Sequence, residues 1–350
     1  MEINDTITAV GLFSGGLDSI LAHRLLMEQG IDVIALHFTS LFLNPWSRRG
    51  KGDGEDQYAR YIEVIQKDCA GKITLKNRDL SPGYLEMLHN PARDYGRQVN
   101  PCIDCHIHML KAAREEMDIA GAKFIFTGEV VGQRPMSQQM RELNYIARES
   151  GLRDLLLRPL SAKHLVMTRP EREGWVDRER LMNITGRGRK PQIEYARSIG
   201  LTDFPNPAGG CILTEVSYGD KVKDMWKHGD KQAMTWNDYE LLQTGRHLRV
   251  SESLKLIVGR DEAENNLLEK HRQDRIMLEV DDIPGPIVLI DAVPEDVTDE
   301  MLEIAASVTG RYSDGDQETE LPIRIVMPNQ EFFTKAKPLS SKEVSKWIIS

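Results

Sequence analysis

The sequence predicts an α/β protein in which a parallel sheet carries helices on both faces, followed by a basic helical segment and a smaller α+β domain. Three observations support this. Apolar, strand-like runs alternate with helical spacing over the first part of the chain. A glycine-rich turn follows the first of these runs. Beyond about residue 245, short β-like runs alternate with acidic and proline-containing turns.

The elements follow in order from these patterns. Residues 7–13 form a short apolar run, residues 18–29 have helical spacing closed by Gly30, and residues 31–38 form a second apolar run. A mobile surface loop is expected over residues 39–57. Later we expect a helix, a strand, a helix and a strand at 58–67, 73–75, 107–117 and 122–128. The basic segment 137–200 is expected to be mostly helical. Strands are expected at 254–258, 276–280, 287–290 and 323–326.

Length and charge suggest how the chain is organised. Its 350 residues, 40% of them hydrophobic, are enough for two or three domains. We expect a first domain over 1–215, a helical linker over 216–245 and a C-terminal domain over 246–350. The net charge of −9 argues against a protein that coats nucleic acid, but residues 133–192 carry thirteen Lys or Arg against seven Asp or Glu.

Neither a signal peptide nor a membrane-spanning run is recognisable. The first residues lack a basic start and an apolar stretch, and no uncharged apolar run approaches the ~18–20 residues that cross a bilayer. The four cysteines are too few for a disulfide scaffold in a chain of this length. We therefore expect a cytoplasmic protein without a membrane partner.

The segment Ser14-Gly15-Gly16-Leu17-Asp18-Ser19 lies between a predicted strand and a predicted helix. Its glycines allow a tight turn close to an anion, and the free N–H groups of the helix start favour phosphate. The Ser14 and Ser19 hydroxyls add donors, and Asp18 can hold Mg²⁺ that is bound to phosphates. No lysine follows the glycines, so the loop is not of the Walker type. The alternative is a glycine turn without a ligand.

This motif resembles that of the PP-loop ATP-pyrophosphatase superfamily, a HUP-like and Rossmann-like fold. The resemblance implies that ATP is cleaved between its α- and β-phosphates and that AMP is transferred to a carbonyl-type oxygen. It also implies that His37, Phe38 and Gly128, at the ends of two strands, frame the adenosine. These residues are equally compatible with ordinary sheet core.

Three cysteines form the second candidate site. Cys102 and Cys105 stand three positions apart just before a predicted helix, and Cys211 follows two glycines. This spacing suits either one shared metal centre or a redox pair, and a helix N-terminus favours the thiolate. Zinc, with His106 or His108 completing the set, is a further possibility. Cys69 is expected to be a packed residue outside the site.

Joined to the phosphate loop, these cysteines resemble the tRNA thiouridylase (tRNA sulfurtransferase) branch of the superfamily. The resemblance implies two routes for sulfur. Either Cys102, Cys105 and Cys211 hold a [4Fe–4S] cluster with one open iron, or two of them act directly through a persulfide. The cysteine at position 102, where persulfide-using members have Asp, favours the cluster.

Two regions are candidates for RNA binding. Gln133 and Arg134 follow a predicted strand that ends at the expected active site, where they are placed to meet ATP or RNA. A basic group follows later in the chain, comprising Arg187, Arg189 and Lys190. The alternative is a solvated, charged face. The stretch 254–266, with Val258-Gly259-Arg260 and Asn265, resembles the RNA-binding module of NFACT-type proteins. A stabilising or dimerising domain is the alternative there.

The expected function is that of an enzyme, an ATP-dependent tRNA uridine thiolase. ATP and Mg²⁺ adenylate a uridine carbonyl, and sulfur from the cysteines then displaces AMP, with Asp18, Cys102, Cys105 and Cys211 as catalytic residues. The partners would be tRNA and a sulfur donor, either sulfide or a cysteine desulfurase or carrier protein, and a homodimer is possible. The alternatives are an amide- or nitrile-forming ligase for a small metabolite and a non-enzymatic RNA-binding or redox protein.

Overall fold

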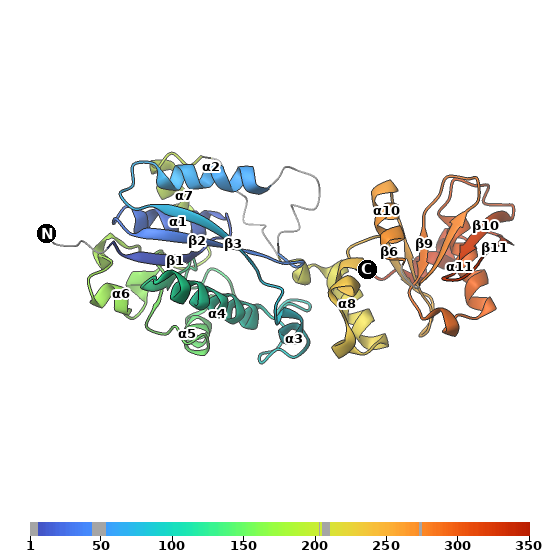
Figure 1. Cartoon of the computed structure of the whole chain (residues 1–350), viewed down its shortest axis with the longest axis horizontal. Helices are drawn as coiled ribbons and strands as arrows, with labels where there is room; N and C mark the ends of the chain where they lie inside the picture. The colour runs from blue at the N-terminus through green and yellow to red at the C-terminus, as the bar shows by residue number, and fades with distance from the viewer. Residues whose placement is uncertain (1–5, 44–53, 203, 205–210, 273–274) are drawn as a thin grey trace. The chain divides into compact units, whose positions relative to one another are not determined.

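The computed structural model describes residues 6–43, 54–202, 204, 211–272 and 275–350, without the side chains of 54–57. The chain forms two compact units, Met1–Thr214 and Glu215–Ser350 (Figure 1). Each unit has its own sheet and its own apolar core. The expected loop over 39–57 is described only in part, because 44–53 lie outside these residues, and the two glycines before Cys211 lie outside them as well, within 205–210.

The first unit is built on a five-stranded parallel sheet in the order β3-β2-β1-β4-β5. This confirms the predicted fold class. Its strands are β1 (Thr8–Leu12), β2 (Asp32–Thr39), β3 (Ile73–Asp79), β4 (Phe124–Phe126) and β5 (Leu156–Leu157). Strand β1 pairs with β2 on one side and β4 on the other, so the strand order reverses at β1. Open sheets of this kind bind ligands at such a point, beyond the carboxyl ends of the strands.

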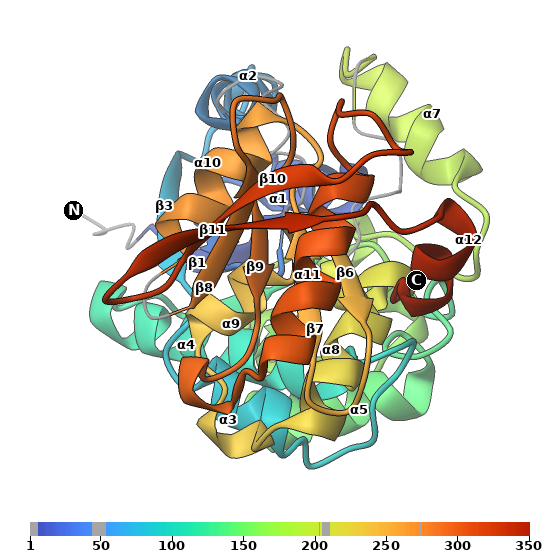
Figure 2. The ribbon, with the colours of Figure 1, turned by 90° about the vertical axis from the view of Figure 1, so that its right-hand side faces the viewer.

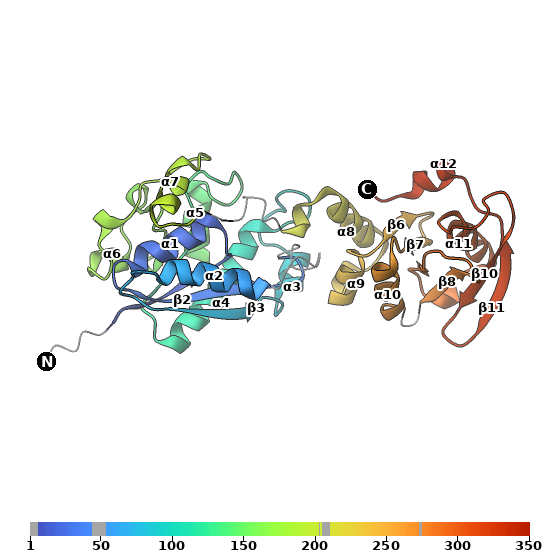
Figure 3. The same cartoon turned by 90° about the horizontal axis from the view of Figure 1, so that it is seen from above.

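Helices cover both faces of this sheet (Figure 1). Helix α1 (Leu17–Met27) contacts α2 (Gly54–Gln66) and α7 (Lys190–Ser198), and Figure 3 shows α1 and α2 side by side. On the other face, α4 (Cys102–Ala120) contacts α5 (Met140–Glu149). The core between these layers is mainly apolar, with Ile20 and Leu21 of α1 and Phe124 and Phe126 of β4 completely buried.

Two helical predictions differ from the structure. Helix α4 begins at Cys102, five positions before the predicted start, so both cysteines are part of its first turns. The basic segment 137–200 is less helical than expected. It contains α5, α6 (Arg169–Arg172), α7 and two short 3₁₀ turns, separated by irregular chain. Prolines and glycines divide this segment, because they end helices after a few residues. The remaining helix of the first unit is α3 (Tyr84–His89).

The second unit contains a six-stranded antiparallel sheet in the order β11-β10-β8-β9-β7-β6 (Figure 2). Its strands are β6 (Arg246–Arg249), β7 (Lys255–Val258), β8 (Ile276–Val280), β9 (Val288–Ile290), β10 (Leu321–Val326) and β11 (Glu331–Ala336). The four predicted strands correspond to β7, β8, β9 and β10. The two edge strands were missed because their polar residues hide the apolar alternation. Helix α11 (Asp299–Arg311) packs on the sheet core through Ala305 and Val308.

The segment 216–245 is helical and is grouped with the second unit. It carries α8 (Val216–His228) and α9 (Trp236–Leu241), and the unit also contains α10 (Glu262–Lys270) and α12 (Ser341–Val344). Asp224 of α8 accepts two hydrogen bonds from Arg249 of β6, at 2.8 and 3.0 Å. These contacts hold α8 on the sheet. Within the described residues, no helix has both the length and the apolar character needed to span a membrane.

Candidate active site

The phosphate-loop motif forms the turn between β1 and α1. Gly15 has a φ of +70°, a left-handed conformation that favours glycine, and a Cβ there would lie 2.5 Å from the Tyr58 ring. The Ser19 hydroxyl donates to the Gly16 carbonyl at 2.8 Å, and the Ser14 hydroxyl donates to Ser19 Oγ at 3.3 Å. No side chain among the described residues caps the start of α1. Its first N–H groups are therefore available to an anion.

Two side chains from distant parts of the chain contact the Asp18 carboxylate. Gln133 Nε2 donates to Asp18 Oδ2 at 2.8 Å, and an Arg189 guanidinium nitrogen lies 3.5 Å from the same oxygen. Buried polar atoms of all three residues, Asp18 Oδ1, Gln133 Oε1 and Arg189 Nε, have no hydrogen-bond partner among the described residues. Buried polar groups are normally satisfied. This unsatisfied cluster fits a polyphosphate and the Mg²⁺ that would accompany it.

The residues expected to frame the adenosine lie around this loop. A Cβ at Gly128 would lie 2.6 Å from the Asp18 carbonyl carbon, so only glycine fits there. His37 is buried, and its Nδ1 lies 2.9 Å from the Phe13 carbonyl oxygen. Burial lowers the pKa of His37, which favours the neutral imidazole as a donor to that carbonyl. Phe38 is buried in the sheet.

The three predicted cysteines gather around Tyr84. Burial raises the pKa of Tyr84 well above its usual value, and the charges of Cys105, Cys211 and Cys102 raise it further. The Tyr84 hydroxyl donates to Cys105 Sγ at 3.5 Å. Backbone hydrogen bonds hold the Cys211 segment in place. Within it, Ile212 N–H donates to the Phe42 carbonyl at 3.1 Å, and the Leu213 carbonyl accepts from Val99 at 3.3 Å. Cys211 therefore lies within electrostatic reach of the same tyrosine as the other two cysteines, despite its distance in sequence.

The pKa values of the two cysteine thiols of α4 are shifted in opposite directions. Burial alone would raise the pKa of the Cys102 thiol, but the hydrogen bond and charge of His106 outweigh it and lower that pKa to about 7. Burial raises the pKa of the Cys105 thiol to about 12. At pH 7, about half of the Cys102 thiol is therefore ionised, whereas Cys105 stays protonated. The difference between the two cysteines comes from His106 and from burial, and not from the helix N-terminus that they share.

A chain of polar side chains extends inward from the half-buried Cys102. His106 lies one helical turn after Cys102, and its Nδ1 is 3.0 Å from Glu129 Oε1. The other carboxylate oxygen of Glu129 accepts from Arg158 Nε at 2.9 Å and from the Thr127 hydroxyl at 3.0 Å. Sequence reasoning named His106 only as a possible zinc ligand and missed Glu129. The spacing of four between Cys102 and His106 on a helix was the available signal.

The donor set does not fit a metal centre as it is arranged. Among the described side chains of His, Cys, Asp and Glu, no three are grouped so that they could hold one metal ion. Cys105 is engaged by Tyr84, and Cys102 interacts with His106. His108 Nε2 lies 3.2 Å from the Leu80 carbonyl, which leaves it bonded to the backbone.

The residues expected to bind RNA separate into two groups. Gln133 and Arg189 lie beside Asp18 at the phosphate loop, as described above. Arg134 is exposed, and its charge helps to lower the pKa of Cys102. Because Gln133 and Arg134 are consecutive, one turn of chain faces both the phosphate loop and the cysteines. Arg187 and Lys190 are exposed.

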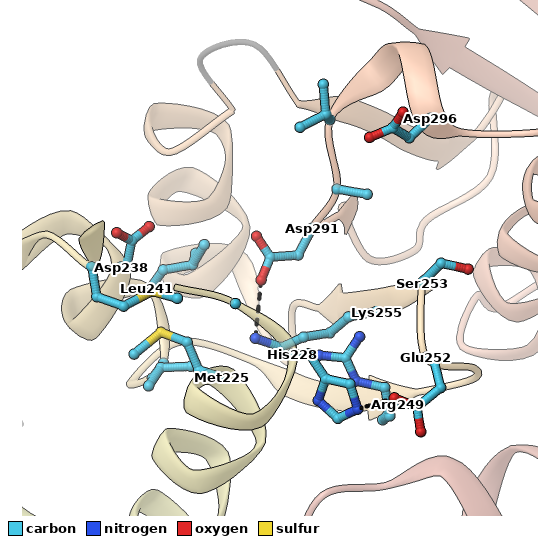
Figure 4. Close-up of a pocket in the computed structure, with 15 residues that line it drawn as sticks. Met225, His228, Asp238, Leu241, Arg249, Glu252, Ser253, Lys255, Asp291 and Asp296 are labelled. Carbon is cyan, nitrogen blue, oxygen red and sulfur yellow. Dashed lines mark hydrogen bonds and ion pairs between the residues drawn. The ribbon is translucent and has the colours of Figure 1, made fainter. Parts of the chain in front are cut away.

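The second unit has a pocket of about 480 Å³ between α8, α9 and the sheet (Figure 4). Two pairs of oppositely charged side chains line it. Lys255 Nζ donates to Asp291 at 2.9 Å, and His228 Nε2 lies 3.0 Å from Glu252. The predicted RNA-binding motif beside it has a structural role, because Asn265 Oδ1 accepts from Ile287 N–H at 3.0 Å. A Cβ at Gly259 would lie 2.0 Å from that same oxygen.

Two family models match the chain. Residues 6–166 match the model described as thiamine biosynthesis protein (ThiI), and residues 245–348 match the NFACT protein RNA binding domain. The second match confirms the resemblance inferred from Val258-Gly259-Arg260 and Asn265.

Curated relatives match over part of the chain. A tRNA-specific 2-thiouridylase MnmA of Nitratidesulfovibrio vulgaris is 35% identical over 129 residues, 34% of this chain. A probable tRNA sulfurtransferase of Thermococcus kodakarensis is 27% identical over 143 residues, 41% of this chain. The chain spans about a third of the length of each relative (34%).

Among solved structures, a 4-thiouridine synthetase–RNA complex with bound ATP aligns with 59% of this chain and 45% of its own. Its identity of 20% and TM-score of 0.40 are too low to carry an argument. The family models and the parallel sheet with its phosphate loop therefore decide the assignment. Residues 6–166 belong to the ThiI family of PP-loop domains, and residues 245–348 belong to the NFACT RNA-binding domain family.

Proposed function

We propose that this protein is an ATP-dependent tRNA uridine thiolase. The observation that carries the proposal is the gathering of Cys102, Cys105 and Cys211 around Tyr84, beside a phosphate loop. A glycine-rich nucleotide loop alone serves many AMP-transferring reactions. A third thiol, brought from a distant segment to two others, serves sulfur transfer.

The phosphate loop would bind ATP and begin the reaction. The first N–H groups of α1 and the Ser14 and Ser19 hydroxyls would hold the phosphates, and Asp18 Oδ1 would hold the Mg²⁺ that accompanies them. Arg189 is placed to stabilise negative charge as pyrophosphate leaves. A uridine carbonyl oxygen attacks the α-phosphate, which converts that oxygen into part of an AMP leaving group.

The cysteines would supply the sulfur. Both a [4Fe–4S] cluster, which position 102 favoured, and a persulfide meet the chemical need. The arrangement of the thiols supports the persulfide, because Cys102 and Cys105 are engaged by His106 and Tyr84. Displacement of AMP by a persulfide sulfur leaves a disulfide to Cys102 when a second thiolate releases the product. A dithiol reductant must then restore the two thiols.

The tRNA is proposed to contact both units. The exposed cations Arg134, Arg187 and Lys190 belong to the first unit, and the NFACT-type domain forms most of the second. The target uridine must leave its stack to reach a site at the end of a sheet, so a loop position of the tRNA is favoured.

Mass spectrometry of tRNA nucleosides from a strain lacking this gene tests the proposal. The expected result is the loss of one thiolated uridine, restored by the wild-type gene but not by a Cys211→Ser gene. Unchanged thiolated nucleosides in the deletion strain would contradict the proposal and favour an AMP-forming ligase for a small metabolite.

A further inference from the structure

We propose that Cys102 is the residue that accepts sulfane sulfur, that His106 is its catalytic partner, and that Glu129 is the residue that positions His106. This inference rests on the proposed thiolation and assigns parts within it. It concerns only the loading of sulfur onto the protein, which precedes any reaction with ATP or tRNA.

The geometry begins with the spacing on α4. Cys102 is the first residue of this helix and His106 follows one turn later, so their side chains share one face. His106 Nδ1 lies 3.0 Å from Glu129 Oε1, which fixes the ring by one nitrogen. The other ring nitrogen remains for the sulfur. Glu129 comes from the chain just after β4, so the relay joins two elements at the carboxyl end of the sheet.

Glu129 is itself held rigidly. Arg158 Nε and the Thr127 hydroxyl both donate to its Oε2, at 2.9 and 3.0 Å, and Arg158 also donates to the Leu143 carbonyl at 3.2 Å. Glu129 and Arg158 are 7% and 4% exposed. A carboxylate with two fixed partners on one oxygen presents the other oxygen in a defined direction, which is how a second residue orients a catalytic histidine.

The surroundings of the two cysteines of α4 favour Cys102 as the acceptor. Cys105 is 5% exposed, and its Sγ already accepts a hydrogen bond from the Tyr84 hydroxyl at 3.5 Å, so a donor cannot reach it without displacing that contact. Cys102 is half-buried and is the first residue of α4, where the free N–H groups of the helix start favour a thiolate.

The loading step balances in atoms and electrons. The Cys102 thiolate attacks the terminal sulfur of a donor persulfide, R–S–SH, so that a new Sγ–S bond forms and the S–S bond of the donor breaks. The donor leaves as R–S⁻, and protonated His106 gives it a proton, which yields R–SH and a Cys102 hydropersulfide. The sulfane sulfur changes carrier without net oxidation or reduction. Uptake of a proton from solvent then restores the protonated His106.

The test uses the full-length protein, glutathione persulfide as the donor, and mass mapping of alkylated cysteine peptides. Wild type is expected to carry the extra sulfur on Cys102. His106→Ala is expected to slow both loading and iodoacetamide alkylation of Cys102 at pH 7 by about fivefold. The thiolate fraction falls by more than that, but a more basic thiolate is a better nucleophile. Added imidazole is expected to restore the rate, which a merely structural role for His106 would not allow.

Glu116→Gln is the matched control for Glu129→Gln. Glu116 is also a buried carboxylate with two cationic partners, Lys76 and Arg78, but it lies on a different part of α4 from Cys102. Glu129→Gln is expected to slow loading, and Glu116→Gln is expected to leave it unchanged. ATP binding by each variant checks that the first unit is folded.

Extra sulfur on Cys105 or Cys211 with Cys102 bare would overturn the assignment. A His106→Ala protein that loads at the wild-type rate would also overturn it, as would iron bound by all three cysteines after anaerobic reconstitution. The outcome is separable from that of the proposed function. Loading that depends on His106, without any thiolated tRNA, would leave this inference standing while the thiolase proposal fails.

Discussion

Helices α1 and α4 both begin at the carboxyl end of the parallel sheet, yet their first turns treat negative charge differently. The start of α1 has free N–H groups, two serine hydroxyls and an unsatisfied Asp18 oxygen, and it is suited to a charged ligand from solution. The start of α4 carries Cys102, and His106 lowers the pKa of that thiol to about 7. In the proposed function, the start of α1 would bind the reagent that activates the substrate, and the start of α4 would prepare the nucleophile.

The largest effect is expected from a substitution that removes one cysteine and leaves the phosphate loop intact. Cys211→Ser is expected to abolish thiolation and to leave ATP-dependent pyrophosphate release intact, because Cys211 belongs to the thiol group around Tyr84 and not to the phosphate loop. Pyrophosphate release and thiouridine formation are measured on the same tRNA. Cys69→Ser, at a cysteine of the first core, is the control. Full thiolation by the Cys211 variant would favour the ligase alternative.

The next largest effect is expected from a substitution that distorts the phosphate loop and leaves the cysteines intact. In Gly128→Ala, the new Cβ would lie 2.6 Å from the Asp18 backbone and 2.7 Å from Ser19 N, so the loop must shift. ATP affinity is expected to fall at least about a hundredfold, since misplacement of a binding group by ~1 Å has effects of this size. Sulfur loading of Cys102 is expected to continue. Gly188→Ala, where a Cβ meets nothing within 4 Å, is the control in isothermal titration with ATP. Equal affinity of the two variants would contradict this geometry.

The stability of the phosphate-loop region is expected to depend on pH through a histidine packed beneath the loop. His23 of α1 is fully buried against Phe13 and Phe126, and its Nδ1 lies 2.7 Å from the Ser19 carbonyl oxygen. Burial lowers the pKa of His23 from 6.5 to about 4. Because the unfolded chain then binds the proton more tightly, the stabilisation is full above pH 6.5 and is lost as the pH falls toward 4.

The size of this loss is about 3 kcal/mol, at about 1.4 kcal/mol for each pKa unit. Urea unfolding of wild type and His23→Gln at pH 7 and pH 4.5 measures it. The variant is expected to lose less stability than wild type over this interval, and an identical loss in both proteins would show that His23 does not carry the effect.

The smallest effect separates two neighbouring arginines. Arg189 lies 3.5 Å from Asp18, whereas Arg187 is exposed. Arg189→Ala is expected to raise the KM for ATP about tenfold, in line with the loss of one charge-assisted contact. Arg187→Ala is expected to weaken tRNA binding and to reduce its salt dependence, with the KM for ATP unchanged. A reversed pattern would return both residues to the single RNA-binding group that the sequence indicated.

The phosphate loop and the sheet could be predicted from the sequence because their signals are local. Six consecutive residues, 14–19, hold the loop chemistry, and apolar runs mark β1 and β2. The chain of contacts from Cys102 through His106 and Glu129 to Arg158 could not be predicted. These residues come from different elements that only the sheet order brings together. For the same reason, the sequence left Gln133 between ATP and RNA and assigned Arg189 to RNA. Their charge or polarity was visible, but their orientation toward Asp18 depends on tertiary structure.

The most direct test of the account is a complete reaction in one vessel with the full-length protein. It contains a tRNA transcript, ATP, Mg²⁺, glutathione persulfide and a dithiol reductant, and thiouridine, AMP and pyrophosphate are counted together. The account predicts equal amounts of the three products, and none of the thiouridine with Cys102→Ser. AMP and pyrophosphate formed without sulfur entering the tRNA would contradict it.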